Sequence, residues 1–387
     1  MNQYPHPAWI EIDLDQFLKN LREIRKMIGI SRLCLLVKAN AYGHGLIGTA
    51  KAAVQGGVDC LGVSCLQEGV QLREAGLAIP ILVLGAIHED QVDDLVRNGL
   101  EFTISSQFKA DLVSQRVTHK CRVHLEVETG MQRTGVRCPT ALRLIDHLRA
   151  LPCFELVGVY SHLATADRPS DPTALQQIEA FRDLIRHPPF RGLVAHIANS
   201  GGVVYYPESH LDMVRPGLLA YGYPPFPLPP FAPCFSLKSK VSYFKVVEAG
   251  VGIGYGHTYT TKKKTRIVTI PIGYGDGYRR ALSNRGSVLI RGRRFPIAGT
   301  ICMDQFMVDV GDAEVYVGDE VVLIGRQGDQ EISLMEIAKM CDTIPYEVLC
   351  WFNERLPRYH FLDRAQKGVE DCHSPFLLSG FRVKMAR

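Results

Sequence analysis

A lysine that ends an apolar run is the first candidate for chemistry in this sequence. Residues 33–37 read as a short buried strand, and Lys38 follows them within the segment VKANAYGHG. A lysine at the rim of a dry core loses its proton more easily than a solvated one, and the free amine forms a Schiff base with a carbonyl. Tyr42 lies one turn further on, with a hydroxyl suited to a phosphate group. Taken alone, a lysine in this position is more often a solvated charge.

Other polar residues follow later apolar runs in the same way. Arg133 lies in the glycine-flanked segment TGMQRTG, and His162 lies in YSHLATAD. Small residues in ANSGG (198–202) and RPGLLAYG (215–222) are suited to bind phosphate through backbone N–H groups. A reactive lysine opposite such a cradle indicates pyridoxal phosphate, whose aldehyde needs an amine and whose phosphate needs donors. The residues expected in the cradle are Ser200, Gly201, Gly217 and Leu218.

The elements that must position these residues alternate regularly between residues 33 and 217. Eight apolar runs separated by helix-like patterns predict an α/β fold of the (β/α)8, TIM-like barrel type, with functional groups at the carboxyl ends of the strands. An open doubly wound sheet is the alternative, but no GxGxxG segment follows the first run. The eight expected strands are residues 33–37, 60–64, 81–85, 101–105, 123–127, 156–160, 193–197 and 211–215.

The clearest helix of the barrel region begins after Asp171. This residue is a good N-cap, and Pro172 suits the first helical position. Leu175, Ile178 and Phe181 are then expected to form one apolar face.

A proline-rich segment at 223–233 marks the start of a different pattern, because its prolines exclude helix and central strand. Closely spaced strand-like runs follow, and then a short helix near residues 334–341, which together predict a second, mostly β C-terminal domain. We therefore expect a cofactor-binding barrel over 10–230 and a β domain over 231–362, joined by residues 1–9. Residues 363–387 form a tail without a readable pattern.

Composition excludes several classes of protein. With 387 residues, 46% hydrophobic content and a net charge of +4, the chain is ordinary for a globular enzyme and shows no nucleic-acid-binding signature. Neither a signal peptide nor a membrane-spanning run is expected. Eleven irregularly spaced cysteines suggest reduced thiols and a cytoplasmic protein. Cys121/His124 and Cys372/His373 lack a matching second pair, so no metal site is expected.

The order of the motifs resembles that of the alanine racemases, a family of barrel-fold pyridoxal-phosphate enzymes. The resemblance extends from WIEIDLDQF near the start to YEVLCWFNERLPR (346–358). It implies a homodimeric isomerase that interconverts L- and D-alanine and supplies D-alanine for peptidoglycan. Its markers are VKANAYGHG, TGMQRTG, SHLATAD, ANSGG, RPGLLAYG, GYGHTY, PIGYGDG, GTICMDQ and PYEV.

The resemblance also implies roles for the residues. Lys38 would hold the cofactor and act as the base on one face of the substrate α-carbon, and Tyr255 from the partner subunit would be the base on the other face. Racemisation needs this pair because a planar carbanion must lose a proton on one side and gain one on the other. Arg215 would face the pyridine nitrogen and leave it unprotonated, since a guanidinium does not give up its proton. His162 would link Arg215 to Tyr255.

The remaining site residues are carried over by the same resemblance. Arg133 and the backbone N–H of Met303 would bind the substrate carboxylate. The phosphate contacts would be Tyr42, Ser200, Gly217, Leu218 and Tyr346, and the entrance would be shaped by Asp304, Tyr274, Arg280 and Asp167.

One position departs from a common pattern of the family. Many members have a carbamylated lysine seven residues before the arginine that binds the carboxylate, and this chain has Glu126 there. A glutamate supplies the negative charge without the modification, so we predict a Glu126–Arg133 contact and no dependence on carbamylation. Because a glutamate is shorter than carbamylated lysine, the pair would need a water or a shifted loop.

Alternatives remain at the level of the sequence. Singly, Arg133 fits a surface salt bridge, His162 fits a core histidine, and Tyr255 fits an ordinary aromatic of the β domain. A racemase of broader amino-acid specificity shares the scaffold. A non-catalytic pyridoxal-phosphate-binding protein would resemble the barrel alone, and the related decarboxylases of basic amino acids lack GYGHTY and ICMDQ.

Overall fold

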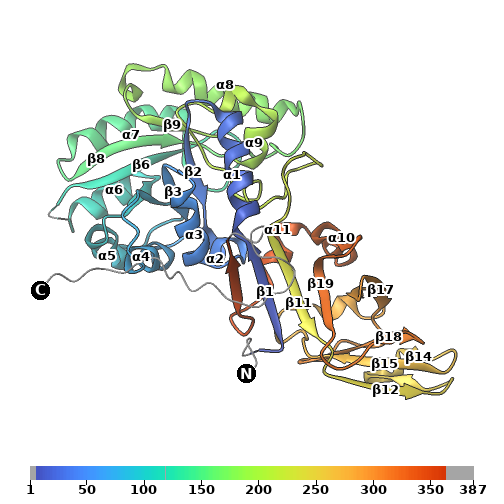
Figure 1. Cartoon of the computed structure of the whole chain (residues 1–387). Coiled ribbons are helices and arrows are strands. Elements are labelled where there is room, and N and C mark those ends of the chain that lie inside the picture. Colours follow the sequence, from blue (N-terminus) through green and yellow to red (C-terminus); the bar gives the residue numbers. More distant parts are fainter. Residues whose placement is uncertain (1–5, 118, 363–387) are drawn as a thin grey trace, which may run out of the picture. The chain divides into compact units, whose positions relative to one another are not determined.

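The computed structural model describes residues 6–117 and 119–362 (Figure 1). The chain forms two compact units. One unit is Gln16–Pro233. The other unit consists of the residues up to Asp15 together with those from Cys234 onward. The predicted tail 363–387 lies outside the described residues. The proline-rich segment 223–233 forms neither helix nor strand, and the two units part directly after it.

The first unit is a nearly closed barrel of eight parallel strands. Their hydrogen-bonded order is β10-β2-β3-β4-β5-β6-β8-β9. The ends of this order are joined by backbone bonds from Asp212 N to Ala195 O (3.1 Å) and from Arg215 N to Ala198 O (2.8 Å). All eight strands predicted from the sequence are present. They are β2 (Arg32–Leu36), β3 (Cys60–Val63), β4 (Ile81–Val83), β5 (Glu101–Ile104), β6 (Cys121–Glu128), β8 (Phe154–Tyr160), β9 (Val194–His196) and β10 (Met213–Val214).

Helices surround these strands, as Figure 1 shows, and their apolar faces cover the barrel. Several begin at a side chain that satisfies an otherwise unpaired N–H: Ser106 accepts from Lys109 N, and Asn199 accepts from Gly202 N. The helices and turns are α1 (Leu14–Ile28), α3 (Leu46–Gln55), α4 (Leu66–Glu74), η1 (Glu89–Gln91), α5 (Val92–Arg97), α6 (Gln107–Ser114), α7 (Cys138–Ala150), α8 (Pro172–Ile185), η2 (Pro188–Phe190), α9 (Ser200–Tyr205) and η3 (Pro207–Ser209), and the short strand β7 (Val136–Arg137) pairs with β6.

Helix α8 begins as predicted, because Asp171 caps it by accepting from Thr173 N at 2.8 Å. The predicted apolar face is wrong at one position. Leu175 is exposed, whereas Ala174, Ile178 and Phe181 are buried. Ala174, Ile178 and Phe181 have the spacing i, i+4 and i+7, which places them on one helix face. The small Ala174 therefore packs where the sequence predicted Leu175.

The second unit is mostly β structure. Its largest sheet has the order β17-β16-β19-β11-β1-β21, and the N-terminal strand β1 pairs antiparallel with β11 and parallel with β21. The elements of this sheet are β1 (Ala8–Asp13), β11 (Phe235–Lys240), β16 (Ser287–Ile290), β17 (Arg293–Pro296), β19 (Glu320–Gln327), β20 (Gln330–Ile332) and β21 (Arg358–Phe361).

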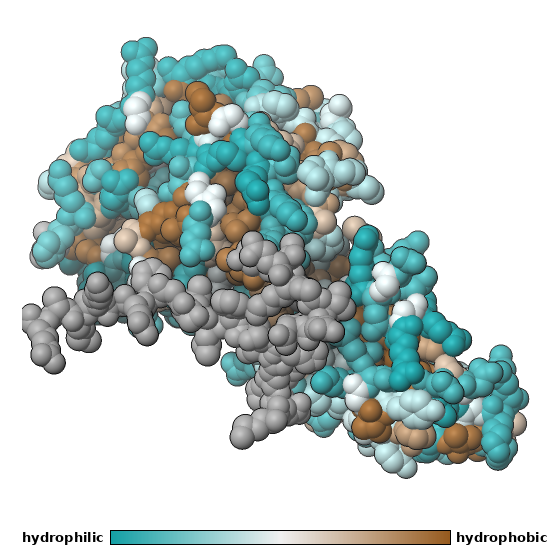
Figure 2. Space-filling model, in the orientation of Figure 1, coloured by the Kyte–Doolittle hydropathy of each residue, from teal (hydrophilic) through white to brown (hydrophobic). Residues whose placement is uncertain are grey.

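A three-stranded sheet, a strand pair and short helices complete this unit. In Figure 2 apolar patches interrupt its polar surface, and the three-stranded sheet carries exposed Tyr243 and Val246. The sheet is β12 (Tyr243–Val247), β15 (Thr265–Ile270) and β18 (Phe306–Gly311); the pair is β13 (Gly252–Ile253) and β14 (Tyr259–Thr260); the helices and turns are η4 (Tyr255–His257), η5 (Arg280–Leu282), α10 (Leu334–Met340) and α11 (Pro345–Cys350). Among the described residues, no helix has the length and apolar content needed to cross a bilayer.

Candidate active site

Lys38 lies at the carboxyl end of the first barrel strand, separated from β2 only by Val37. It begins the segment labelled α2 (Lys38–Tyr42), in which four consecutive residues, 39–42, have φ between 52° and 55°. This is a left-handed turn, which costs L-residues roughly 1–2 kcal/mol each. Surrounding contacts stabilise it: Ala39 N donates to Glu68 Oε1 (2.6 Å), and Asn40 Oδ1 accepts from Leu46 N (2.7 Å). Strain of this kind concentrates at functional sites.

Tyr42, at the end of this turn, belongs to a small cradle of polar groups. Gly217 N and Leu219 N donate to Ser200 Oγ at 3.0 and 3.3 Å. A Cβ at Gly217 would lie 2.4 Å from the Tyr42 hydroxyl oxygen, so only glycine lets the two come together. Three strand ends thus bring two hydroxyls and backbone N–H groups to one place. Such a cradle fits the phosphate of pyridoxal phosphate, and Lys38 on the same rim supplies the amine.

Arg215 lies inside the barrel, almost completely buried. Its Nη2 donates to Ser161 O (2.7 Å) and to His162 Nδ1 (3.3 Å), and its guanidinium lies 5.1 Å from the centre of the Tyr160 ring. Burial lowers the pKa of Arg215, but a guanidinium starts so high that it stays charged. A hydrogen bond therefore joins Arg215 to His162, and the predicted continuation from His162 to Tyr255 stays a prediction.

His162 acts as a neutral acceptor in this link. Burial, together with the charges of Arg215, Arg133 and Lys38, lowers the pKa of His162 to about 3. An imidazole with this pKa is uncharged near neutral pH, so its Nδ1 lone pair accepts from Arg215.

Glu126 and Arg133 form no direct ion pair among the described residues, so a contact between them would need the water or shifted loop that the sequence predicts. Glu126 Oε1 accepts from the Thr134 hydroxyl at 2.7 Å. Arg133 is exposed on the loop after β6, whereas Glu126 is buried. The cause is the short glutamate side chain, which reaches the residue next to Arg133. Burial raises the pKa of Glu126, and the Thr134 hydrogen bond and the charges of Arg133 and Arg215 oppose this rise.

Sequence reasoning missed a set of polar residues inside the barrel. Glu101, His124 and His196 are buried in β5, β6 and β9, and hydrogen bonds connect them to Arg215. A signal was present, because each is a titratable residue within an otherwise apolar strand. His124 hydrogen-bonds to Glu101 and His196 through its two ring nitrogens.

Of the other predicted residues, Asp167 is exposed on the loop after β8, and the rest belong to the second unit. Tyr255 begins the turn η4 and is 73% exposed, while Thr300 Oγ1 holds its carbonyl at 3.0 Å. Met303 is 55% exposed, and its carbonyl accepts from Gly275 N at 2.8 Å. Tyr274 N donates to Cys302 O at 3.1 Å, so the GYGDG and ICMDQ segments lie against each other. Arg280 is in η5, and exposed Tyr346 is in α11.

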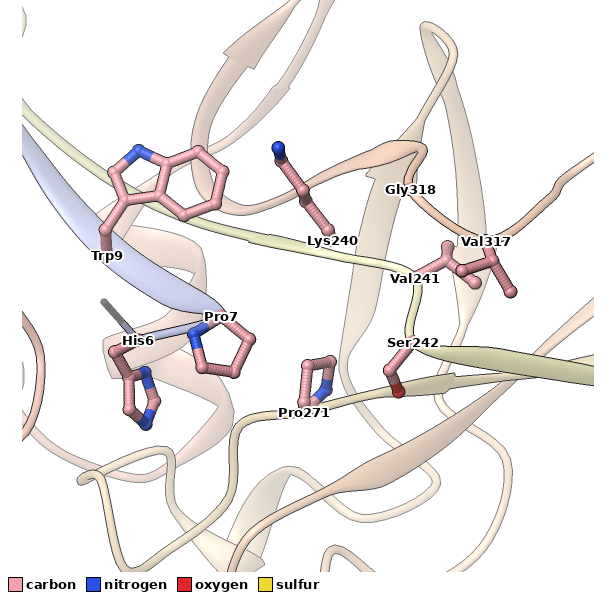
Figure 3. A pocket seen from close by; sticks show the side chains of 9 residues that line it. All are labelled: His6, Pro7, Trp9, Lys240, Val241, Ser242, Pro271, Val317 and Gly318. Carbon is pink, nitrogen blue, oxygen red and sulfur yellow. The ribbon is translucent and has the colours of Figure 1, made fainter. Parts of the chain in front are cut away.

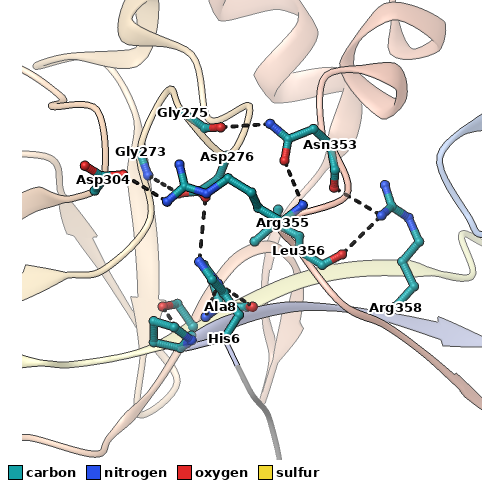
Figure 4. A network of polar contacts seen from close by, with 12 residues as sticks. His6, Ala8, Gly273, Gly275, Asp276, Asp304, Asn353, Arg355, Leu356 and Arg358 are labelled. Atoms are coloured by element: carbon teal, nitrogen blue, oxygen red, sulfur yellow. Dashed lines mark hydrogen bonds and ion pairs between the residues drawn. The ribbon is translucent and has the colours of Figure 1, made fainter.

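Ionic contacts hold the same two segments together (Figure 4). Buried Asp276 accepts from Gly273 N (3.0 Å), and its other oxygen lies 3.2 Å from Arg355 Nε. Arg355 also reaches Asp304 Oδ1 at 2.9 Å, and His6 Nε2 lies 3.7 Å from Asp276. The structure thus brings Tyr274, Met303 and Asp304 together, and Arg355 and Asp276 are supporting residues that sequence reasoning missed.

A pocket of about 160 Å³ also lies in the second unit (Figure 3). Its walls are largely apolar, and the Lys240 ammonium lies over the Trp9 ring, 5.9 Å from its centre. None of the residues predicted to do chemistry lines it. The lining residues are His6, Pro7, Trp9, Lys240, Val241, Ser242, Pro271, Val317 and Gly318.

A parallel barrel with a lysine and a phosphate cradle at its strand ends defines a barrel enzyme of the pyridoxal-phosphate class. Sequence profiles narrow this class: the alanine racemase N-terminal domain matches residues 12–225, and the alanine racemase C-terminal domain matches residues 234–360. The chain belongs to the alanine racemase family.

Individual relatives agree with this assignment. The alanine racemase of Symbiobacterium thermophilum is 43% identical over 365 residues, which cover 92% of this chain and 97% of the relative. A solved alanine racemase of Clostridium difficile 630 has a TM-score of 0.86 and 36% identity, covering 92% of this chain and 96% of that one. The alanine racemase of Bacillus anthracis, solved with bound L-Ala-P, has a TM-score of 0.88 and 34% identity, covering 93% and 96%.

Proposed function

We propose that this chain interconverts L- and D-alanine with Lys38 and Tyr255 as the two bases. The observation that carries the proposal is the convergence of Lys38, Tyr42, Ser200 and Gly217 at one barrel rim, in a chain of the alanine racemase family. Pyridoxal phosphate, when bound, withdraws electrons from the substrate and so lets the α-proton leave.

The protein groups have separate tasks in this proposal. Lys38 binds the cofactor and exchanges a proton on one face of the α-carbon, and the Tyr255 hydroxyl does so on the other face. Tyr42, Ser200, Gly217, Leu218 and Tyr346 would hold the cofactor phosphate, and Arg133 and the backbone N–H of Met303 would bind the substrate carboxylate.

Arg215 would keep the nitrogen of the cofactor ring unprotonated. Its guanidinium is charged and donor-only, so it donates toward the ring nitrogen and does not transfer its proton. A ring that stays unprotonated withdraws electrons less strongly, which favours return of the proton to the same carbon. Because neutral His162 accepts from Arg215 (3.3 Å), its remaining ring N–H is available to Tyr255.

A homodimer is part of the proposal. Tyr255 and Met303 are exposed in the second unit, and we infer that they complete the site of a partner chain's barrel. We likewise propose a cytoplasmic enzyme that supplies D-alanine for peptidoglycan. We also propose domain limits of 10–230 for the barrel and 231–362 for the β domain, with residues 1–9 joining the latter; strand β1, which extends to Asp13, pairs within the sheet of the second unit.

The test is incubation of the purified protein with L-alanine in deuterated water, with and without added pyridoxal phosphate. Optical rotation should fall to zero, and deuterium should enter the α-position, only with the cofactor.

L-serine as a second substrate separates alanine specificity from a broader racemase: one added polar group should be rejected by roughly 10–200-fold. A cofactor-bound protein that exchanges no α-proton would leave only the non-catalytic binding function.

A further inference from the structure

We propose that Glu101 is a positioning residue for Arg215, acting through His124 and His196. The inference rests on the proposed role of Arg215 at the cofactor ring. It concerns a buried row of side chains that crosses the barrel interior from β5 to the segment after β10. Each link in the row is a hydrogen bond.

The row has continuous hydrogen-bond geometry. Arg215 Nη1 lies 2.7 Å from His196 Nδ1, and His196 Nε2 lies 3.0 Å from His124 Nδ1. His124 Nε2 in turn lies 3.0 Å from Glu101 Oε2. Glu101, His124, His196 and Arg215 are each at most 7% exposed, so water does not substitute for these partners.

Only one arrangement of protons satisfies the row. Arginine has no acceptor, so Arg215 donates to His196 Nδ1, and the proton of His196 must lie on Nε2. His196 then donates to His124 Nδ1, which places the proton of His124 on Nε2, facing Glu101. A second proton on either ring would set two N–H groups against each other. Both histidines are therefore neutral, and every bond points toward the Glu101 carboxylate.

The carboxylate at the end of the row is held ionised. Burial alone would raise the pKa of Glu101, but the hydrogen bonds from His124 and Arg122 and the charge of Arg122 lower it below its usual value. Arg122 Nε lies 2.8 Å from Glu101 Oε1. Burial and the charge of Arg215 lower the pKa of His196 far below its usual value, which agrees with a neutral ring.

The backbone is shaped to admit this row. Gly158 on β8 lies opposite His124 on β6, and a Cβ there would lie 2.2 Å from His124 Nδ1. The His196 ring stacks on Tyr160 with centres 5.0 Å apart, and the Tyr160 hydroxyl lies 2.8 Å from Thr103 Oγ1. The two imidazoles thus have one position each, and Arg215 Nη1 has one direction in which to donate.

The consequence is an orientation fixed at a distance. A guanidinium can rotate to satisfy other acceptors, but the ionised end of this row favours the rotamer in which Nη1 points to His196. Its Nη2 then points to Ser161 O and His162. Loss of the charge at Glu101 weakens the acceptor of the His124 Nε2 proton, so the row no longer favours this rotamer and Arg215 loses its fixed direction.

The first test is imidazole ¹⁵N NMR on the wild-type holoenzyme. Both histidines should be neutral with the proton on Nε2; a cationic ring, or a proton on Nδ1 of either residue, overturns the proposal. This readout does not require racemase activity, so its failure is distinguishable from failure of the proposed function.

The second test compares Glu101→Gln with two matched variants. Glu101→Gln should weaken the hydrogen bond at His124 Nε2, seen as a shift of its ¹⁵N resonance, and raise transamination relative to racemisation by about tenfold, the equivalent of one hydrogen bond. Glu101→Asp keeps the charge and should restore the wild-type ratio. Glu155→Gln removes the other carboxylate near Arg122 (3.3 Å) without touching the row, and should change neither. Equal behaviour of Glu101→Gln and Glu155→Gln overturns the proposal.

Discussion

The polar row inside the barrel and the ionic contacts of the second unit each hold an arginine side chain in place, but they do so by different interactions. Inside the barrel, Arg215 is balanced through two neutral histidines that lead to one carboxylate, all buried. In the second unit, Arg355 bridges Asp276 and Asp304 directly, and its side chain is 45% exposed. The first arrangement depends on each donor and acceptor in turn. The second arrangement depends on electrostatic attraction between charged groups, and solvent ions screen this attraction where the groups are exposed.

The two kinds of contact suit different requirements. The Arg215 guanidinium must keep its orientation, whereas the loops of the second unit must only keep their position. Arg215 has to point at one atom, so a chain of directional bonds serves it. The loops around Met303 have only to stay together, so backbone contacts such as Gly275 N to Met303 O and a solvated ion pair are sufficient. Substitutions should therefore have sharper effects in the barrel.

The largest expected effect is that of Lys38→Ala. Without the amine, the barrel loses both its bond to the cofactor and one base, so racemisation should fall by at least about 10³-fold. Absorbance of the purified protein should show no bound cofactor. Lys51→Ala, on the neighbouring helix α3, is the control and should stay yellow and active. A yellow, active Lys38→Ala protein would end the two-base assignment.

Tyr255→Phe tests the exposed half of the site. The change removes one base and leaves the ring, so the rate of proton removal from L-alanine should fall by roughly 10²–10⁴-fold. Exchange of the D-alanine α-proton in deuterated water should fall much less, because Lys38 remains. Tyr243→Phe makes the same change on exposed strand β12 and should be silent. Equal losses with both enantiomers would contradict the division of faces.

The two arginines give the most direct comparison of stability. Arg215→Gln leaves buried His196 Nδ1 without its charged donor and removes one of the two cations near Glu126, so the free energy of unfolding should fall by about 3–5 kcal/mol. Arg355→Gln should cost less, because Arg355 is 45% exposed and buried Asp276 keeps its bond from Gly273 N, and its effect should shrink in high salt. Urea unfolding at low and high salt measures both. Similar costs would remove the distinction between the two networks.

Acid should destabilise the barrel through its neutral histidines. The folded-state pKa values of His162 (about 3) and His196 lie below the unfolded value of about 6.5, so the unfolded chain binds more protons below that pH. Stability should therefore fall as the pH drops below about 6.5, by up to about 1.4 kcal/mol per pH unit for each residue. Urea unfolding at several pH values measures the slope. His162→Gln should flatten it, and exposed His187→Gln should not.

The smallest expected effect is that of bicarbonate. Glu126 is a carboxylate without modification and is bonded to Thr134, so racemase activity should be the same with and without added bicarbonate. Activity that rises with bicarbonate would show that a carbamylated group is needed. Glu126→Lys is the informative partner variant, since it should introduce this dependence.

Sequence patterns revealed the strands and the strand-end residues because both follow local rules. Lys38 and Ser200 each stand directly after an apolar run, which is visible without a structure. The direct partner of Glu126 could not be predicted, because one methylene or one residue of loop decides whether it reaches Arg133 or Thr134. Leu175 was misplaced because helix periodicity cannot distinguish neighbouring faces when a small alanine does the packing.

The polar row of the barrel could not be predicted, for a different reason. Glu101, His124 and His196 come from three strands, and only the register of those strands sets His124 within 3.0 Å of both partners. Gly158 is needed to make room, yet nothing in its local sequence distinguishes it from an ordinary strand glycine. Arg355 and Asp276 likewise meet only through the folding of two loops.

The turn at residues 39–42 has a stereochemical consequence. Ala39 and Ala41 are L-residues held at φ of 52° and 53°, dihedral angles that their mirror images adopt without strain. A chain assembled by chemical ligation with D-alanine at position 39 should therefore keep its backbone course and unfold at a higher temperature. The turn thus holds two L-alanines in the backbone conformation that D-alanine, the proposed product of this enzyme, adopts without strain.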